Sequence, residues 1–250
     1  MSESDEIVKV GRMLSVSEMF GPTLQGEGPS QGMPAFFIRL GLCNLDCRWC
    51  DTPYTWDWTG KNGYAYSKQI ELKRMSVDDV VERCKTSIAP QLIVISGGEP
   101  MLQQRSMLDL AKRLIAADHR IEIETNGTVM PEDGWEPLAH NYDVHFNVSP
   151  KLWNSGVAAD DAIKIDVLRR LYDMAATFKF VVQSPECVMQ VNRIVNDVGL
   201  LPQDVYLMPE GRSQQEILNA LPRVFDDCIH YGYNLTPRMH VLAYGQTRGV

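Results

Sequence analysis

Short apolar runs alternate along the chain with longer segments in which apolar residues recur at helical spacing. The runs occupy residues 35–40, 92–95, 120–124, 142–148, 177–182 and 205–208. The first run is apolar almost throughout, which is typical of a strand buried on both faces of a parallel sheet. Helices are predicted over residues 76–85, 104–117, 160–172, 185–198 and 213–230. About six core strands alternate with helices, which indicates an α/β fold. With right-handed crossovers, this number of strands favours an incomplete, open βα barrel of parallel strands over a closed eight-stranded one.

Three further segments lie outside this alternation. Residues 14–20 alternate weakly between apolar and polar positions and predict a strand on the edge of the sheet. Residues 21–29 are rich in glycine and proline, which predicts a loop. Residues 53–74 carry Trp and Tyr without a clean period, so we interpret them as an irregular insertion whose rings either line a site or cover the core. Because no internal repeat or low-complexity segment occurs, residues 1–250 are predicted to form a single domain.

Polar residues and glycines follow the predicted strands at the same end. Ser-Gly-Gly-Glu-Pro follows the strand at 92–95, Thr-Asn-Gly-Thr follows 120–124, and Ser-Pro-Lys follows 142–148. The carboxyl ends of parallel strands meet at one mouth of a barrel, so we expect a functional site there. Glycines at a strand end also let a ligand approach the backbone closely.

Arg39 and His145 are ionisable residues within predicted strands. An unpaired guanidinium in a core is unfavourable, so Arg39 is expected either to form a structural ion pair or to face an anionic ligand. Its position four residues before Cys43 favours the ligand. His145 alternates within its strand, and we interpret it as a core histidine with a satisfied hydrogen bond.

Composition and charge narrow the class of protein. The 250 residues are 44% hydrophobic and 22% charged, and no apolar run approaches the roughly 20 residues of a membrane span. The acidic start at residues 1–6 is unlike a signal peptide, so a cytoplasmic protein is expected. A formal charge of −8 argues against a broad nucleic-acid surface. Any connection to RNA is therefore expected to run through a metabolite, and neither a nucleic acid nor a membrane is expected as a direct partner.

Three of the six cysteines, Cys43, Cys47 and Cys50, lie within eight residues in the spacing Cys-x3-Cys-x2-Cys. A structural zinc site usually takes two separated ligand pairs, and the sequence has no second pair with such spacing. Three clustered thiolates instead suit a cubane iron–sulfur cluster with one iron left open. A zinc-stabilised binding module is the non-catalytic alternative. The other cysteines are predicted in helices as small core residues in a reducing compartment: Cys84, Cys187 and Cys228.

The cysteine spacing resembles that of the radical S-adenosylmethionine (SAM) superfamily, whose members hold a 4Fe-4S cluster in this way. The resemblance implies that SAM chelates the open iron through its amino and carboxylate groups. Gly97, Gly98, Glu99 and Pro100, after a predicted strand, match the superfamily's site for the amino group of SAM. The Glu99 carboxylate can accept hydrogen bonds from an ammonium group. The two motifs together are stronger evidence than either motif alone.

The pattern over nearly the whole chain is similar to that of the 7-carboxy-7-deazaguanine synthases. The similar segments are residues 24–28, 39, 43–52, 96–100, 124–128, 149–151 and 240–245. The resemblance implies a lyase that converts 6-carboxy-5,6,7,8-tetrahydropterin to 7-carboxy-7-deazaguanine with loss of ammonia, in queuosine and 7-deazapurine biosynthesis. It also implies that the cluster and SAM supply a radical, while the protein supplies orientation and electrostatics.

The same resemblance assigns roles to individual residues. Cys43, Cys47 and Cys50 would hold the cluster, and the Thr52 hydroxyl would be the hard oxygen ligand for Mg²⁺. The residues expected to contact SAM are Trp49, Cys50, Asp51, Gly98, Glu99, Ser149, Pro150, Lys151, Met208, Pro209, Glu210 and Gly211. The residues expected to contact the substrate are Leu24, Gln25, Gly26, Glu27, Arg39, Ser96 and the final residue, Val250. The Arg39 fork suits a carboxylate, and Ser96 keeps the hydroxyl of the threonine that relatives often have.

Partners and a rival interpretation complete these expectations. A flavodoxin-type reductant is expected because the cysteines leave no second set for an internal relay, and a homodimer is also expected. The rival enzyme class is the glycyl-radical-activating enzymes, which share the cysteine spacing and a similar Gln-Gly-Glu-Gly loop but act on a large protein partner. A requirement for Thr52 and Arg39 in pterin turnover would separate the two.

Overall fold

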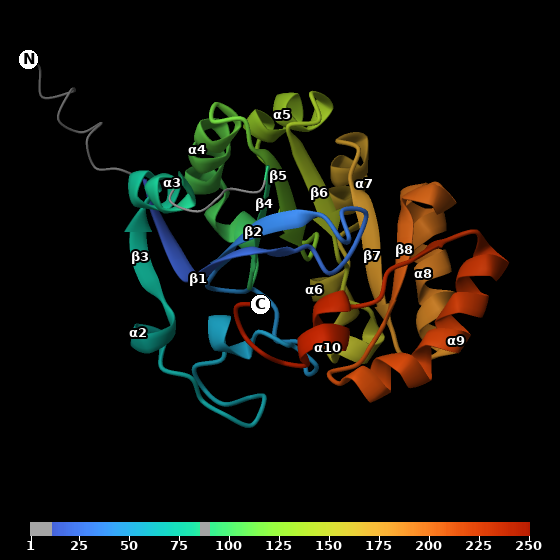
Figure 1. The fold of residues 1–250 in the computed structure, drawn as a ribbon. Helices are drawn as coiled ribbons and strands as arrows, with labels where there is room; N and C mark the ends of the chain where they lie inside the picture. Colours follow the sequence, from blue (N-terminus) through green and yellow to red (C-terminus); the bar gives the residue numbers. More distant parts are fainter. Residues whose placement is uncertain (1–11, 86–90) are drawn as a thin grey trace, which may run out of the picture.

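The computed structural model describes residues 12–85 and 91–250, and a single curved sheet runs through them (Figure 1). The order of its strands is β3-β1-β2-β4-β5-β6-β7-β8-β9. In chain order they are β1 Met13–Leu24, β2 Pro34–Leu40, β3 Lys73–Ser76, β4 Leu92–Gly97, β5 Arg120–Thr125, β6 Val144–Val148, β7 Thr177–Val182, β8 Val205–Pro209 and β9 Asn234–Leu235. Strand β2 and strands β4 to β9 pair in parallel with their neighbours in this order. Strand β1 is antiparallel to both β2 and β3. The sheet is open, because its two edges are formed by β3 and β9.

Helices connect the strands, and Figure 1 shows the longer ones around the outside of the sheet and α10 close to the C-terminus. The α-helices are α2 Lys68–Glu71, α3 Val77–Lys85, α4 Gln104–Ile115, α5 Glu136–His140, α6 Ala159–Ala162, α7 Ile165–Asp173, α8 Pro185–Val198, α9 Gln214–Tyr231 and α10 Met239–Tyr244. The 3-10 turns are η1 Pro53–Thr55, η2 Pro100–Gln103, η3 Asp133–Trp135, η4 Trp153–Ser155 and η5 Pro202–Asp204.

Local sequence explains where the longest helix begins and ends. The side chain of Ser213 accepts a hydrogen bond from the backbone N–H of Glu216, and the carboxylate of Glu216 accepts one from the N–H of Ser213. This capping box satisfies N–H groups that the first turn of α9 leaves unpaired. The helix ends at Gly232, whose φ of +72° is favourable for glycine.

The two faces of the central strands differ in polarity, and this difference positions the site. On β5, Ile121 and Ile123 belong to the main hydrophobic core, whereas Glu122 and Glu124 point to the opposite face. Phe178 and Phe180 on β7 alternate with Lys179 in the same way. The sheet therefore packs an apolar outer face against helices and turns a partly polar inner face toward the hollow of the barrel.

The predicted open βα barrel is confirmed, and its six predicted parallel strands are β2 and β4 to β8. The predicted edge strand was placed wrongly, because β3 pairs outside β1, and β1 also extends through Leu24 into the predicted loop. The predicted helix at 160–172 is divided into α6 and α7. The irregular segment at 53–74 contains η1, α2 and the start of β3.

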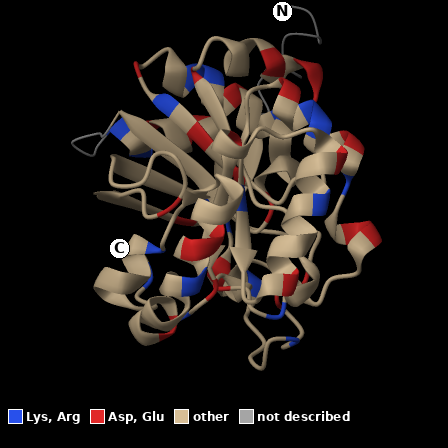
Figure 2. Cartoon of the chain, turned by 90° about the vertical axis from the view of Figure 1, so that its right-hand side faces the viewer, with Lys and Arg blue, Asp and Glu red and all other residues tan. Residues whose placement is uncertain are grey.

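Charged residues of both signs are interspersed on the view in Figure 2, as expected of a chain without a broad basic surface. In the described ranges 12–85 and 91–250, no helix combines the length and apolar character needed to cross a bilayer. The acidic stretch at residues 1–6 lies outside the described residues.

Candidate active site

A cavity opens on the inner face of the sheet, at the carboxyl ends of the parallel strands. Its empty volume is about 1310 Å³, part of which is open to solvent. Successive strand ends contribute Arg39, Ser96, Glu124, Val181 and Met208 to its lining. The prediction that polar strand ends would meet at one mouth is therefore confirmed.

The loop that carries the cysteines is fixed to the end of β4 by a close backbone contact. Leu42 has a φ of +72°, which is unusual for a residue with a side chain, and its carbonyl accepts a hydrogen bond from the N–H of Glu99 at 2.8 Å. A Cβ atom at Gly98 would lie 2.0 Å from the Leu42 carbonyl oxygen, and one at Gly97 would lie 2.0 Å from that of Leu40. The two glycines thus allow the strand end to touch the cysteine loop.

The three thiols are free and line the cavity together. The backbone N–H of Leu45 donates to the Cys43 sulfur at 3.4 Å, and the Trp56 indole N–H donates to the Cys50 sulfur at 3.3 Å. Burial raises the pKa of Cys43 to about 12 and that of Cys47 to about 11, so metal binding would have to release thiol protons.

The donor set fits an iron–sulfur cluster. Soft thiolates select iron–sulfur clusters, and a cubane spreads its ligands over several irons. The three cysteines line one cavity and supply three such thiol ligands.

The irregular segment after the cysteines supports their loop. The Asp57 carboxylate accepts hydrogen bonds from four successive N–H groups, those of residues 59–62, and folds this segment into a turn. The Asn62 side chain then donates to the Cys47 carbonyl at 3.1 Å. From the other side, the Arg212 guanidinium donates to the carbonyl of Arg48 at 3.3 Å.

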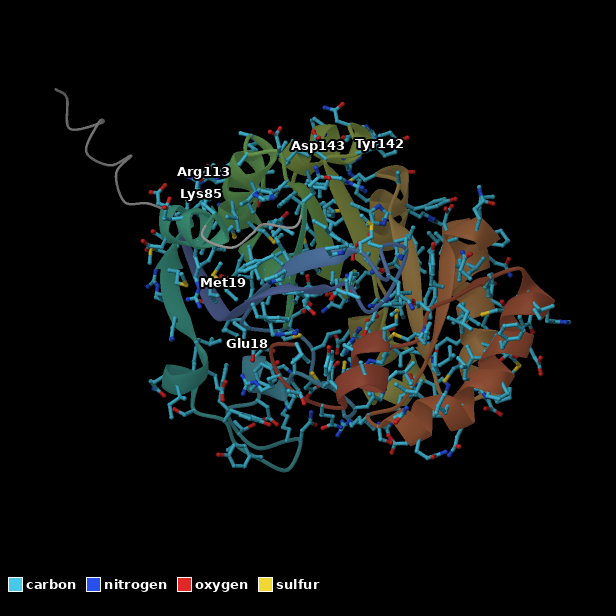
Figure 3. All side chains as sticks on the ribbon, in the orientation of Figure 1. Glu18, Met19, Lys85, Arg113, Tyr142 and Asp143 are labelled. Atoms are coloured by element: carbon cyan, nitrogen blue, oxygen red, sulfur yellow. The ribbon has the colours of Figure 1, made fainter. Side chains whose placement is uncertain are left out.

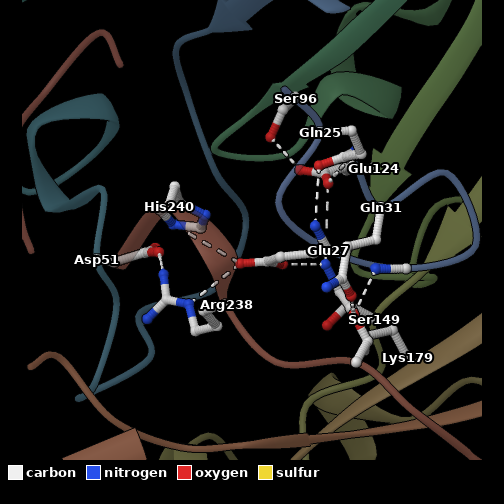
Figure 4. A network of polar contacts seen from close by, with 12 residues as sticks. Gln25, Glu27, Gln31, Asp51, Ser96, Glu124, Ser149, Lys179, Arg238 and His240 are labelled. Atoms are coloured by element: carbon white, nitrogen blue, oxygen red, sulfur yellow. Dashed lines mark hydrogen bonds and ion pairs between the residues drawn. The ribbon is translucent and has the colours of Figure 1, made fainter. Parts of the chain in front are cut away.

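A buried ionic network lies beside the cysteine loop (Figure 4). Glu27 pairs with Lys179 and with Arg238, whose Nε lies 3.1 Å from the Glu27 carboxylate, and Arg238 also pairs with Asp51. Burial alone would raise the pKa of Glu27, but the charges of Lys179, Arg238 and His240 outweigh burial and lower it. Burial would lower the pKa values of Lys179 and Arg238, but nearby carboxylates raise them: Glu27 and Glu124 act on Lys179, and Asp51 and Glu27 act on Arg238. This network is therefore ionised at neutral pH.

Two glutamates of β5 extend the network through Gln25. The Gln25 amide nitrogen donates to Glu122 at 2.5 Å and lies 3.3 Å from Glu124, which also accepts a hydrogen bond from Ser96 at 2.7 Å. Burial and the neighbouring charge of Glu124 raise the pKa of Glu122 to about 7. Because its amide nitrogen is engaged by two carboxylates, Gln25 has its carbonyl oxygen as the remaining polar group, and the Glu27 N–H lies 3.3 Å from that oxygen.

Of the two alternatives that the sequence left open for Arg39, the structural ion pair is present, and the guanidinium also lines the cavity. Its Nε is paired with Glu18 at 3.1 Å, and the guanidinium also lies over the Phe20 ring and lines the cavity. Burial would lower the pKa of Arg39, but the surrounding Tyr54 and Glu18 raise it. Arg39 is therefore a fixed positive charge at the cavity wall.

Most of the residues predicted to bind SAM, substrate or Mg²⁺ line this cavity. They are Leu24, Gln25, Gly26, Glu27, Arg39, Trp49, Cys50, Asp51, Thr52, Ser96, Gly98, Ser149, Lys151, Met208, Glu210, Gly211 and Val250. Thr52 is 9% exposed, and its hydroxyl lies 3.7 Å from the Cys50 sulfur. Lys151 donates to the Ser149 hydroxyl at 3.0 Å and lies over the Trp49 ring.

The structure places Glu99, Pro150 and Pro209 outside the cavity lining. The Glu99 carboxylate is fully buried and accepts hydrogen bonds from the N–H groups of Met101 and Asn126 and from the Thr125 hydroxyl. Burial raises the pKa of Glu99. In this conformation Glu99 connects the ends of β4 and β5 behind the cavity wall.

Several lining residues were not predicted from the sequence. They are Phe20, Phe37, Lys179 and Arg238, whereas Trp56, Glu124 and His240 lie in segments already singled out from the sequence, but without a role of their own. Lys179 interrupts an apolar strand as Arg39 does, so the same reasoning could have identified it. Arg238 precedes the segment 240–245 and had no sequence signal of its own, and only the folded chain brings Arg238 and His240 to Glu27.

Comparisons with known proteins agree on one family. The Radical SAM superfamily profile matches residues 38–219. The 7-carboxy-7-deazaguanine synthase of Pyrobaculum aerophilum is 35% identical over 94% of this chain and 96% of its own length, and that of Hyperthermus butylicus is 32% identical over 92% of each. The crystal structure of QueE from Escherichia coli superposes with a TM-score of 0.70 at 24% identity, covering 96% of this chain and 100% of that chain, which supports the same fold.

Proposed function

The chain belongs to the 7-carboxy-7-deazaguanine synthase family of the radical SAM superfamily, and from this premise we propose how its cavity carries out the family's reaction. The substrate is 6-carboxy-5,6,7,8-tetrahydropterin, the product is 7-carboxy-7-deazaguanine, and ammonia is lost. The observation that carries the proposal is the convergence of three free thiols, the glycine-rich strand end and a buried ionic network on one cavity.

Cys43, Cys47 and Cys50 would hold the 4Fe-4S cluster on the cavity wall. When bound, the cluster and SAM supply the radical chemistry that the protein's own side chains lack. Gly98 lines the cavity at the end of β4, while Trp49 and Lys151 form an adjacent wall. A structure of the Streptococcus suis protein SuiB bound to S-adenosylmethionine shares the fold, with a TM-score of 0.52 at 14% identity over 78% of this chain and 47% of that chain.

The polar groups of the cavity suit a flat heterocycle that bears a carboxylate. Arg39 provides a fixed guanidinium for the carboxylate, and a planar fork matches a carboxylate bidentately. The carboxylates of Glu27 and Glu124 can accept hydrogen bonds from the amino and ring N–H groups of the pterin. Phe20 stacks on Phe37 at 5.1 Å between ring centroids and supplies an apolar surface beside Arg39.

We further propose a ligand for Mg²⁺, a class of electron donor and an oligomeric state. The Thr52 hydroxyl is an oxygen donor next to Cys50 and would ligate Mg²⁺ together with substrate and water. A flavodoxin-type reductant and a homodimer complete the proposal. We also propose that the chain is one radical SAM domain, with residues 53–74 inserted to support the cysteine loop through Asp57 and Asn62.

A carboxylate-specific test distinguishes this function from activation of a protein partner. The anaerobically reconstituted protein is assayed for SAM cleavage with 6-carboxytetrahydropterin and with tetrahydropterin that lacks the carboxylate. Cleavage coupled to turnover is expected only with the carboxylate, and Arg39→Lys should raise KM by about tenfold because a lysine loses the fork. Equal SAM cleavage with both pterins and no change in Arg39→Lys would contradict the proposal and favour a protein substrate.

A further inference from the structure

The C-terminal segment returns to the cavity after α10. The helix ends at Tyr244, and the chain then runs back so that its final residue, Val250, lines the cavity. A Cβ atom at Gly249 would lie 3.9 Å from the Cβ of Phe20, so the segment passes directly beside β1. Figure 1 shows the C-terminus close to α10 and to the N-terminal strands. Residues 246–250 thus bring Val250 to the wall of the site.

The Arg248 side chain connects this C-terminal segment to three different elements. The Arg248 Nε lies 2.7 Å from the carboxylate of Glu18 on β1, and another guanidinium nitrogen lies 2.8 Å from that of Glu71 on α2. The guanidinium carbon also lies 3.5 Å from the centroid of the Tyr54 ring in η1. A planar cation that pairs with two carboxylates while stacking on an aromatic ring has little freedom to move.

Glu18, which is labelled in Figure 3, connects this contact to Arg39 on the cavity wall. One of its oxygens accepts from Arg248, and the other accepts from Arg39 at 3.1 Å and from the Tyr54 hydroxyl at 3.4 Å. Both Arg39 and Val250 line the cavity. The position of the C-terminal segment and the orientation of Arg39 therefore depend on the same carboxylate.

We propose that Arg248 is a positioning residue, which anchors the C-terminal segment so that Val250 forms part of the substrate site and Glu18 holds Arg39 in place. This inference rests on the proposed function for the nature of the substrate, but the anchoring itself does not depend on it. Glu71 and Tyr54 complete the anchor, and neither of them is assigned a contact with SAM or substrate.

The anchoring is tested without any turnover. Wild-type protein, Arg248→Gln, Glu71→Gln and the control Arg105→Gln are treated with a carboxypeptidase, and release of the C-terminal residues is followed by mass spectrometry. Arg105 pairs with Glu132 at 2.9 Å but is 82% exposed and does not line the cavity. Loss of two ion pairs and a cation–π contact should speed trimming of Arg248→Gln by roughly tenfold, with a smaller effect for Glu71→Gln and none for the control.

The positioning role is tested by the division between KM and kcat. Arg248→Gln should raise KM for the pterin by about tenfold, as expected when a binding wall is misplaced, with unchanged iron content and a smaller change in kcat. Arg248→Lys should restore part of the effect, because a lysine keeps the charge but cannot bridge both carboxylates.

The outcomes separate this inference from the proposed function. Unchanged trimming in Arg248→Gln would overturn the anchor whatever the substrate is. Faster trimming with an unchanged KM would overturn the positioning role. If wild-type protein forms no 7-carboxy-7-deazaguanine, the proposed function fails, whereas the trimming result still decides the anchor.

Discussion

The buried pair of Lys179 and Glu27 provides a quantitative test of the ionic network. Lys179 is 4% exposed, donates to Glu27 and lies 3.8 Å from Glu124. Lys179→Met would remove the cation while leaving two carboxylates in a buried site. Loss of one partner from a buried pair typically destabilises a protein by about 3 to 5 kcal/mol. Because Glu27 keeps Arg238 at 3.1 Å, we expect the lower end, about 3 kcal/mol.

The assay is urea unfolding at pH 7 under anaerobic conditions, followed by circular dichroism. The double variant Glu27→Gln/Lys179→Met removes the uncompensated charge as well and should recover about 2 kcal/mol of the loss. Lys61→Met, which breaks an exposed pair with Asp46, is the control and should leave the unfolding midpoint unchanged within error. A loss below about 1 kcal/mol in Lys179→Met, or a double variant less stable than the single one, would refute this reasoning.

Three further predictions concern the cysteine loop, a buried histidine and the metal ligand. Gly98→Ala should destabilise the protein by about 1 to 3 kcal/mol and lower its iron content, because the new Cβ would meet the Leu42 carbonyl at 2.0 Å; normal iron in this variant would contradict the close-approach argument. Burial lowers the pKa of His145 to about 4, so between pH 4 and the usual pKa of 6.5 the unfolded chain binds more protons than the folded chain. The free energy of unfolding should therefore rise by about 2 kcal/mol from pH 4 to pH 6.5. Urea unfolding as a function of pH should show a smaller rise in His145→Asn than in wild type. Thr52→Val should raise the Mg²⁺ concentration for half-maximal turnover by about tenfold with unchanged iron content, whereas Thr52→Ser should behave as wild type; equal Mg²⁺ dependence in all three proteins would remove Thr52 as the ligand.

Central strands such as β4 and β7 could be predicted because their sequences are short and mainly apolar. The bounds of β7 were predicted to the residue and β4 was predicted from its first residue, and the polar residues after β4 pointed to the site. β1 was harder, because its position depends on the pairing of β3 with its outer side. Such a pairing joins distant segments and leaves little trace in local periodicity.

Some residues of the site could be predicted from the sequence and others could not, as was the case for the strands. The cysteines and the glycine-rich strand end form short motifs, so Cys43 and Gly98 could be singled out as candidate site residues from spacing, residue type and the family resemblance. Arg238 and Arg248 could not, because each acts through partners more than 170 residues away in the chain, such as Glu27 and Glu71. Only the folded sheet shows that such charges pair with one another and not with solvent.

The most direct test of the account is a single anaerobic turnover experiment. The protein is reconstituted with iron and sulfide, then incubated with SAM, Mg²⁺, dithionite and 6-carboxytetrahydropterin, and the products are quantified by mass spectrometry and an ammonia assay. The account predicts 7-carboxy-7-deazaguanine and ammonia in equal amounts, and neither product from a variant with Cys43, Cys47 and Cys50 changed to Ala. Formation of 5′-deoxyadenosine without the deazaguanine would contradict it.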